Sequence, residues 1–252
     1  MSPNTDELEA ILISRQDYRD NDLIVRLLTA EQGQVHAVAR SAKASRRRFG
    51  GALDYGNHLR AMLKPGKGEL WTLVEVKLLN NRPAIRTDLE RVAMLGYACE
   101  AISALARTDH PEPQLYGLLN VSCLLLEGAP RPPGAMFRLG LEAKALTFSG
   151  LTPMLTRCLE CMGPIDGPPG PPLSYDPQRG GALHGACDKV GGRSVSLKWL
   201  LGIEAARRTP LKQLVAARPP AGPSFALAET IEAHTERVLR SRNVLASLHP
   251  YG

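Results

Sequence analysis

The sequence predicts an α+β protein in which β structure comes first and helices follow. Residues 8–80 carry short apolar runs, rich in β-branched residues and separated by polar turns. Residues 86–150 change to apolar spacings of three and four, and these spacings return from residue 195 onward. Between the two helical stretches, residues 151–193 are rich in glycine and proline. The expected modules are residues 1–80, 81–153, 154–193 and 194–252.

Five strands are expected in the first module: Ala10–Arg15, Leu23–Thr29, Val35–Ala39, Leu59–Leu63 and Leu70–Leu79. Turn residues such as Lys64–Gly68 separate them. Five short strands in a small domain are typical of an OB-type barrel, which binds oligonucleotides on one face. A small SH3-like barrel would give the same pattern.

The first expected helix follows a capping box made by Thr87 and Glu90. Its apolar stripe consists of Val92, Leu95, Cys99, Ile102 and Ala106. Further helices are expected over residues 114–126, 135–148, 195–208 and 224–242, with residues 210–223 mostly loop. Residues 151–193 are expected to be irregular and to build no normal core of their own.

Composition narrows the function classes. The 252 residues include 31 Lys and Arg against 25 Asp and Glu, a formal charge of +6, which permits a polyanionic partner. No phosphate-binding loop, G-x-S-x-G or H-E-x-x-H motif occurs, so we expect no enzyme. The carboxylates of Asp17, Asp20 and Asp22 leave a metal-dependent nuclease as an alternative. An acidic start without a secretory signal predicts a cytoplasmic protein.

A basic segment, Arg40–Arg48, follows the third expected strand. It holds Arg40, Lys43, Arg46, Arg47 and Arg48, and no acid occurs from Gln32 to Leu53. We expect a mobile loop whose cations bind nucleic-acid phosphates. The expected patch is extended by Arg15, Arg19, Arg60, Lys64 and Lys67. A solvated run of surface charge is the alternative.

Four residues have the spacing of a structural zinc site. Cys158-x2-Cys161 is followed after 22 residues by His184-x2-Cys187, and two close ligand pairs match a zinc ribbon or knuckle. One tetrahedral ion would explain how this glycine- and proline-rich segment folds. Three reduced cysteines and an unrelated histidine are the alternative. Cys99 and Cys123 lie on apolar helix faces and are expected in the core.

Three stretches together resemble the bacterial recombination mediator family RecO. They are Tyr18–Gly33 (YRDNDLIVRLLTAEQG), Ala39–Lys43 with the arginines and Phe49–Leu53 (FGGAL), and Gly180–Cys187 (GGALHGAC). The resemblance covers nearly the whole chain and implies an N-terminal OB-fold, a helical bundle and a zinc-binding insertion. His184 stands where the family usually has cysteine, although imidazole is also a good zinc ligand.

The resemblance also implies a function. RecO proteins bind single- and double-stranded DNA and anneal complementary strands without ATP, which suggests a nucleoid-associated location. They act with RecR and with the acidic C-terminal tail of single-stranded-DNA-binding protein, so that recombinase can load. Arg131, Arg138 and Lys144 of the helical domain are candidates to bind that tail. The competing hypothesis is a zinc-stabilised protein-interaction scaffold with incidental DNA binding.

Overall fold

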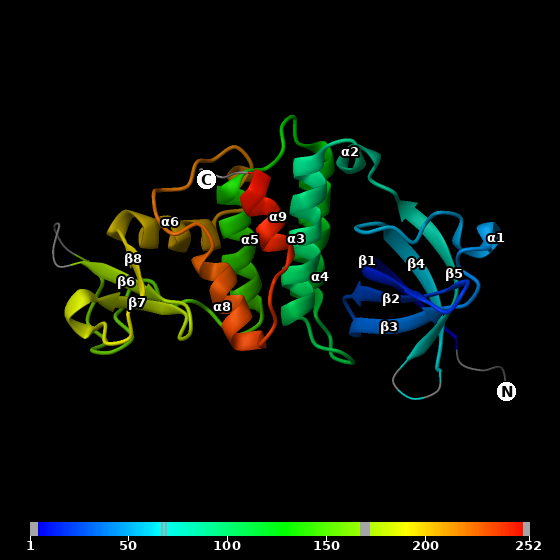
Figure 1. Ribbon diagram of the computed structural model, residues 1–252, viewed down its shortest axis with the longest axis horizontal. Coiled ribbons are helices and arrows are strands. Elements are labelled where there is room, and N and C mark those ends of the chain that lie inside the picture. Colours follow the sequence, from blue (N-terminus) through cyan, green and yellow to red (C-terminus); the bar gives the residue numbers. More distant parts are fainter. Residues whose placement is uncertain (1–4, 67, 69, 167–171, 249–252) are drawn as a thin grey trace. The chain divides into compact units, whose positions relative to one another are not determined.

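The computed structural model describes residues 5–66, 68, 70–166 and 172–248, which fall into two compact units (Figure 1). The first unit is Met1–Glu127 and the second is Gly128–Gly252. The first begins with a closed β-barrel, whereas the second is mainly helical and carries a small sheet. The α+β class expected from the sequence is therefore confirmed.

Five strands close the barrel in the order β1-β2-β3-β5-β4. They are β1 (Asp6–Tyr18), β2 (Asp22–Thr29), β3 (Gly33–Ala39), β4 (His58–Lys64) and β5 (Trp71–Asn80). β3 and β5 pair in parallel, and the other neighbours are antiparallel. This order, with helix α1 (Arg46–Phe49) between β3 and β4, confirms an OB-type barrel over the SH3-like alternative.

β1 is the strand whose limits differ most from the expected ones. It extends beyond the apolar run at both ends, because its first part pairs with β4 and its second part with β2. The register shifts between Leu12 and Ser14, and such a bulge bends a strand around a barrel. The added residues are mostly polar, so their pattern carries little strand signal.

Side chains alternate between the two faces of each strand, and those on the inner face fill the barrel. On β2, Leu23, Val25 and Leu27 are buried inside, whereas Ile24 and Arg26 point outward. Phe49 of α1 joins the same buried cluster. The short helix between β3 and β4 is thus anchored to the barrel core by its last residue.

Three helices complete the first unit: α2 (Pro83–Arg86), α3 (Leu89–Leu105) and α4 (Pro113–Gly128). The prediction that Thr87 caps this helix is wrong by one residue. Asp88 is the N-cap, and its carboxylate accepts from the Arg91 backbone N–H, while the Thr87 hydroxyl donates to the Ala84 carbonyl. Val92 is also not part of the buried stripe, since 42% of it is exposed.

The second unit is built around α5 (Ala135–Phe148), against which α6, α7 and α8 pack. These helices are α6 (Leu197–Arg208), α7 (Leu211–Leu214) and α8 (Ala226–Thr235), followed by α9 (Ser241–Leu248). The single helix expected over residues 224–242 is wrong. α8 ends where Glu236 adopts a left-handed conformation with φ 54°, and α9 starts after a short break.

The described residues of the 151–193 segment, 151–166 and 172–193, are more ordered than expected. Strands β6 (Leu173–Asp176), β7 (Gly181–His184) and β8 (Arg193–Val195) form a sheet in the order β7-β6-β8. A 3-10 turn, η1 (Gly185–Cys187), follows β7. Tyr175 and Ala182 are fully buried, so this glycine- and proline-rich segment does contribute to a core.

Candidate nucleic-acid interface and metal centre

The basic segment is an ordered turn and not the mobile loop expected from its composition. The Ser41 backbone N–H donates to the Asp22 carboxylate over 2.8 Å, and the Lys43 N–H donates to the Asn21 carbonyl over 3.1 Å. Phe49 anchors the far end in the core. Composition could not reveal this order, because the acceptors lie on the separate β1–β2 turn. We call residues 40–48 the basic turn.

The five cations of the basic turn differ in their surroundings. Lys43 Nζ lies 3.0 Å from an Asp17 carboxylate oxygen. Arg48 lies over the Phe49 ring and donates to the Arg40 carbonyl over 2.8 Å and to the Ser45 hydroxyl over 3.1 Å. The side chains of Arg40, Arg46 and Arg47 are exposed, and no acidic partner lies within ion-pair distance among the described residues. These three arginines are therefore available to an anionic ligand.

Two of the other basic residues in the expected patch are paired with carboxylates. Arg15 lies 2.5 Å from Asp54. Arg60 on β4 lies 3.1 Å from Glu9 and 3.6 Å from Glu7, so its charge is balanced by β1. Arg19 is exposed and lies over the Tyr18 ring, and Lys64 is half-buried at the end of β4. Lys67 lies outside the described residues.

Arg26 is a further candidate for binding nucleic acid, which the sequence did not reveal. The alternation along β2 places it on the outer surface of the barrel, opposite His36 of β3 in the strand register. Strands β2 and β3 form the face on which OB-folds bind oligonucleotides. A lone arginine in an apolar run carries little signal by itself, but its outward position in the alternation could have identified it.

Two of the three acids proposed for a nuclease serve structural roles. Asp22 caps the basic turn and Asp17 pairs with Lys43. Across the described ranges, one group alone brings three or more possible metal ligands together, and it contains no carboxylate. The geometry thus gives the nuclease alternative no support.

That group consists of Cys158, Cys161, His184 and Cys187, whose ligand atoms all lie within 4.8 Å of one another. Cys161 Sγ is 3.4 Å from His184 Nδ1. Zn–S bonds of about 2.3 Å in a tetrahedron would bring such ligands only slightly closer together. The four residues therefore fit a metal ion, and three sulfurs with one imidazole are a donor set that zinc favours.

The surroundings of these ligands also fit a metal site. His184 Nε2 lies 3.1 Å from the Pro164 carbonyl, which favours a proton on Nε2 and leaves the Nδ1 lone pair for the metal. Burial raises the pKa of Cys158, but backbone N–H groups of Cys161, His184 and Glu160 outweigh this and lower it to about 6. Desolvation and the neighbouring thiols raise the pKa of Cys187 to about 11.

Cys99 and Cys123 are unlike these ligands. Both are buried in helices of the first unit. Burial is the largest cause that raises the pKa of Cys99 well above its ordinary value and the pKa of Cys123 to about 11. They are neutral core residues, as expected.

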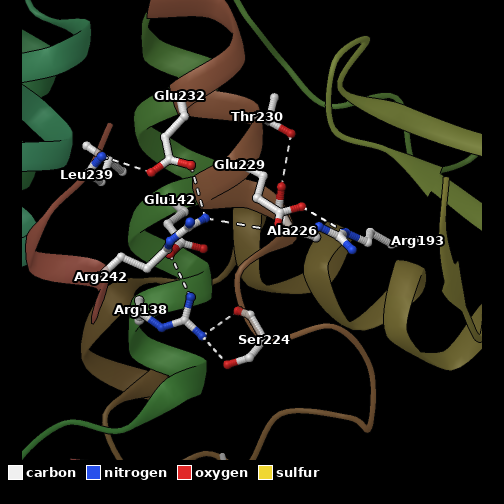
Figure 2. A network of polar contacts seen from close by, with 10 residues as sticks. All are labelled: Arg138, Glu142, Arg193, Ser224, Ala226, Glu229, Thr230, Glu232, Leu239 and Arg242. Carbon is white, nitrogen blue, oxygen red and sulfur yellow. Dashed lines mark hydrogen bonds and ion pairs between the residues drawn. The ribbon is translucent and has the colours of Figure 1, made fainter. Parts of the chain in front are cut away.

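Arg138 is not at the surface, where a docked peptide could reach it. It is 3% exposed, and its guanidinium donates to Glu142 over 2.7 Å and to the Ser224 carbonyl and hydroxyl over 2.5 and 3.1 Å (Figure 2). Lys144 donates to the Arg207 carbonyl over 2.6 Å, and burial lowers its pKa. Of the three residues considered for tail binding, Arg131 alone is exposed.

The fold and the site define a class: an OB-barrel protein with an ordered basic turn, followed by a helical region that carries a Cys3His ligand group. Among the residues that the structure describes, no helix is long and apolar enough to span a membrane. Family models described as "Recombination protein O N terminal" and "Recombination protein O C terminal" match residues 1–82 and 86–242. The chain belongs to the RecO family.

Individual relatives agree with this assignment. The "DNA repair protein RecO" of Anaeromyxobacter dehalogenans (strain 2CP-C) is 36% identical over 260 residues, covering 97% of each chain. Its namesake in Symbiobacterium thermophilum is 34% identical and covers 96% of each chain. That of Myxococcus xanthus is 32% identical over 83% of this chain and 86% of its own.

Proposed function

We propose that this chain is a DNA-repair recombination mediator that binds single- and double-stranded DNA and anneals complementary strands without ATP. The ordered basic turn is the observation that carries the proposal, because it holds three exposed arginines on an OB-type barrel. Membership of the RecO family supports it. The role is one of binding and requires no catalytic residue.

The proposed mechanism is electrostatic. Arg40, Arg46 and Arg47 bind phosphates and release counterions, and Arg26 extends the binding surface over the outside of the barrel. DNA strands whose phosphates are neutralised repel one another less, and their bases stay free to pair. The half-buried outward residues beside Arg26 are Ile24, His36 and Val38, of which His36 alone carries a ring, so base stacking contributes little and sequence preference is weak.

Removal of two exposed charges tests this interface. In an Arg46→Gln, Arg47→Gln variant, we expect the affinity for a single-stranded oligonucleotide to fall roughly tenfold at moderate salt. The slope of log affinity against log salt should decrease by roughly 0.7 for each phosphate that the variant no longer neutralises. Fluorescence anisotropy across a salt series measures both quantities. Arg48 is left unchanged because it packs on Phe49.

The matched control removes two charges from the β4–β5 part of the same barrel. Arg60→Gln with Lys77→Gln should leave affinity and salt slope nearly unchanged, since Arg60 is already paired with β1 carboxylates. Annealing of complementary oligonucleotides without ATP should slow in the first variant only. Equal losses in both variants would show non-specific attraction and contradict the assignment.

We further propose that the Cys3His group holds one structural zinc ion. Its four protein ligands leave no open position for a substrate, which is typical of a structural site. When bound, the ion cross-links the Cys158–Cys161 turn to the end of β7. The ligand separations and the His184 orientation are the observations that support this role.

We also propose RecR and the acidic tail of single-stranded-DNA-binding protein as partners, with the exposed Arg131 as the residue that binds the tail. Anisotropy with the labelled tail peptide should show several-fold weaker binding for Arg131→Gln, because this variant removes an exposed positive charge that would face the acidic tail. Lys189→Gln, which removes another exposed charge of the second unit, is the control. Unchanged binding for Arg131→Gln would remove the tail assignment.

A further inference from the structure

Helix α8 is held by polar contacts on two sides. On the side of the small sheet, the Tyr175 hydroxyl of β6 lies 2.8 Å from the Thr230 hydroxyl, and both side chains are buried. Arg193 of β8 donates to both Glu229 oxygens over 3.0 and 2.9 Å (Figure 2). On the other side, Glu232 accepts from the Leu239 backbone N–H over 2.8 Å, just before α9.

Glu229 belongs to both sets of contacts. Arg242 of α9 places Nη1 at 3.0 Å from Glu232 and 3.9 Å from Glu229, the carboxylate that Arg193 also binds (Figure 2). A continuous set of charges therefore runs from β8 through α8 to α9. We call Arg193, Glu229, Glu232 and Arg242 the relay.

The relay residues surround an open space between the small sheet and α8. An open pocket of about 650 Å³ lies between the β6–β7 turn, the residues before β8, and α8. It is lined by relay residues together with Asp176, Gln178 and Gly191. The relay residues line this pocket, so beside the buried Tyr175–Thr230 contact the sheet meets α8 there through charged side chains.

The sheet in turn is tied to the ligand turns. The Leu159 N–H, next to Cys158, donates to the Ala182 carbonyl of β7, and the Ala182 N–H donates to the Met154 carbonyl. His184 ends β7. Strands of three or four residues are too short to be stable alone, so the sheet that carries Tyr175 and Arg193 depends on the cross-link between its ligand turns.

We propose that the metal centre controls the order of the C-terminal helix α9 through the relay. This inference rests on the proposed zinc site. With the ligand turns cross-linked, β8 holds Arg193 on Glu229, and α8 then holds Arg242 and the start of α9. Without the cross-link, the sheet loosens, the relay opens at Arg193, and the hold of α8 on α9 weakens.

Hydrogen–deuterium exchange of the full chain tests the relay, with zinc content measured on the same samples. Chelation of the metal should increase exchange in β6–β8 and also, roughly tenfold, in residues 237–248. Arg193→Gln should retain the zinc and the protection of β7, yet expose residues 237–248 as chelation does. Tyr175→Phe should have a smaller effect, because its ring still packs on Trp199.

Arg179→Gln is the matched control, because Arg179 pairs with Glu160 within residues 154–195 and does not belong to the relay. It should leave the exchange of α9 unchanged. Absence of zinc from the purified chain would overturn both the metal site and the relay. Zinc that binds and can be removed without a change at α9, or an Arg193→Gln variant that keeps α9 protected, would overturn the relay alone.

Discussion

His58 is a titratable residue at the junction between the barrel and α4. Its Nε2 lies 3.0 Å from the Tyr116 hydroxyl and 3.5 Å from a Glu9 carboxylate oxygen. Burial lowers the pKa of His58 and outweighs the opposing effect of Glu9. Burial also raises the pKa of Tyr116 to about 12, so that its hydroxyl stays protonated over the physiological range.

The lowered pKa of His58 predicts a pH-dependent stability. As pH falls below the unfolded value near 6.5, the unfolded chain takes up the proton first, so the free energy of unfolding decreases until the folded pKa is reached. Urea unfolding at pH 5.5 and 7.5 should show a smaller difference for His58→Gln than for the wild type. The same difference in both proteins would show that His58 titrates alike in the two states.

At the residue scale, the sequence identified the cations but not their partners. Arg15 pairs with Asp54 and Arg60 with Glu9, which are 39 and 51 positions away. Such pairs depend on the strand register, which composition does not reveal. The candidate metal ligands could be grouped from the sequence because each pair is local, with two intervening residues that place both side chains on one turn.

At the scale of elements, long periodic segments were predicted well and short ones were not. The five barrel strands and α5 follow clear patterns of period 2 or 3.6. β6, β7 and β8 span only three or four residues each, too few to show a period among glycines and prolines. The break between α8 and α9 lacks glycine or proline, so no local residue marked it.

We call residues 154–195 the metal lobe, and we expect the fold of the whole lobe to depend on the four candidate ligands. With the proposed zinc site, we expect the wild type to bind roughly one equivalent of zinc, and Cys158→Ser to lose this zinc and to loosen β6–β8 while the barrel strands keep their protection. Metal analysis and hydrogen exchange measure the two effects. Cys123→Ala, which removes a core thiol, should keep its zinc. Full zinc retention by Cys158→Ser would contradict the ligand assignment.

At the scale of the molecule, the barrel forms a single unit with α3 and α4. Buried Gln34 of β3 donates to the Ser103 and Ala106 carbonyls over 2.9 and 2.5 Å, and its backbone N–H donates to the Arg107 carbonyl. Gly33 has φ +63°, and a Cβ there would lie 2.3 Å from the Arg107 carbonyl oxygen. No side chain other than hydrogen fits this close approach of strand and helix end.

The contacts between β3 and the end of α3 predict which fragments of the chain fold stably. A fragment of residues 1–127 should unfold cooperatively, with the barrel and the two helices melting together. A fragment of residues 1–80 should be markedly less stable, because Gln34 and the apolar surface under α3 lose their partners. Urea titration followed by circular dichroism compares them. An equal midpoint for the two fragments would show that the barrel is independent of the helices.

The basic turn has a consequence for how a nucleic acid approaches the first unit. Residues 1–127 carry sixteen acidic and sixteen basic side chains, so this unit has no net charge at pH 7. Five of its cations lie within residues 40–48, whereas Glu7 and Glu9 lie on β1 and Glu75 lies on β5. The three exposed arginines of this turn therefore form a local region of positive charge on a unit without net charge, and this region orients an incoming phosphate chain.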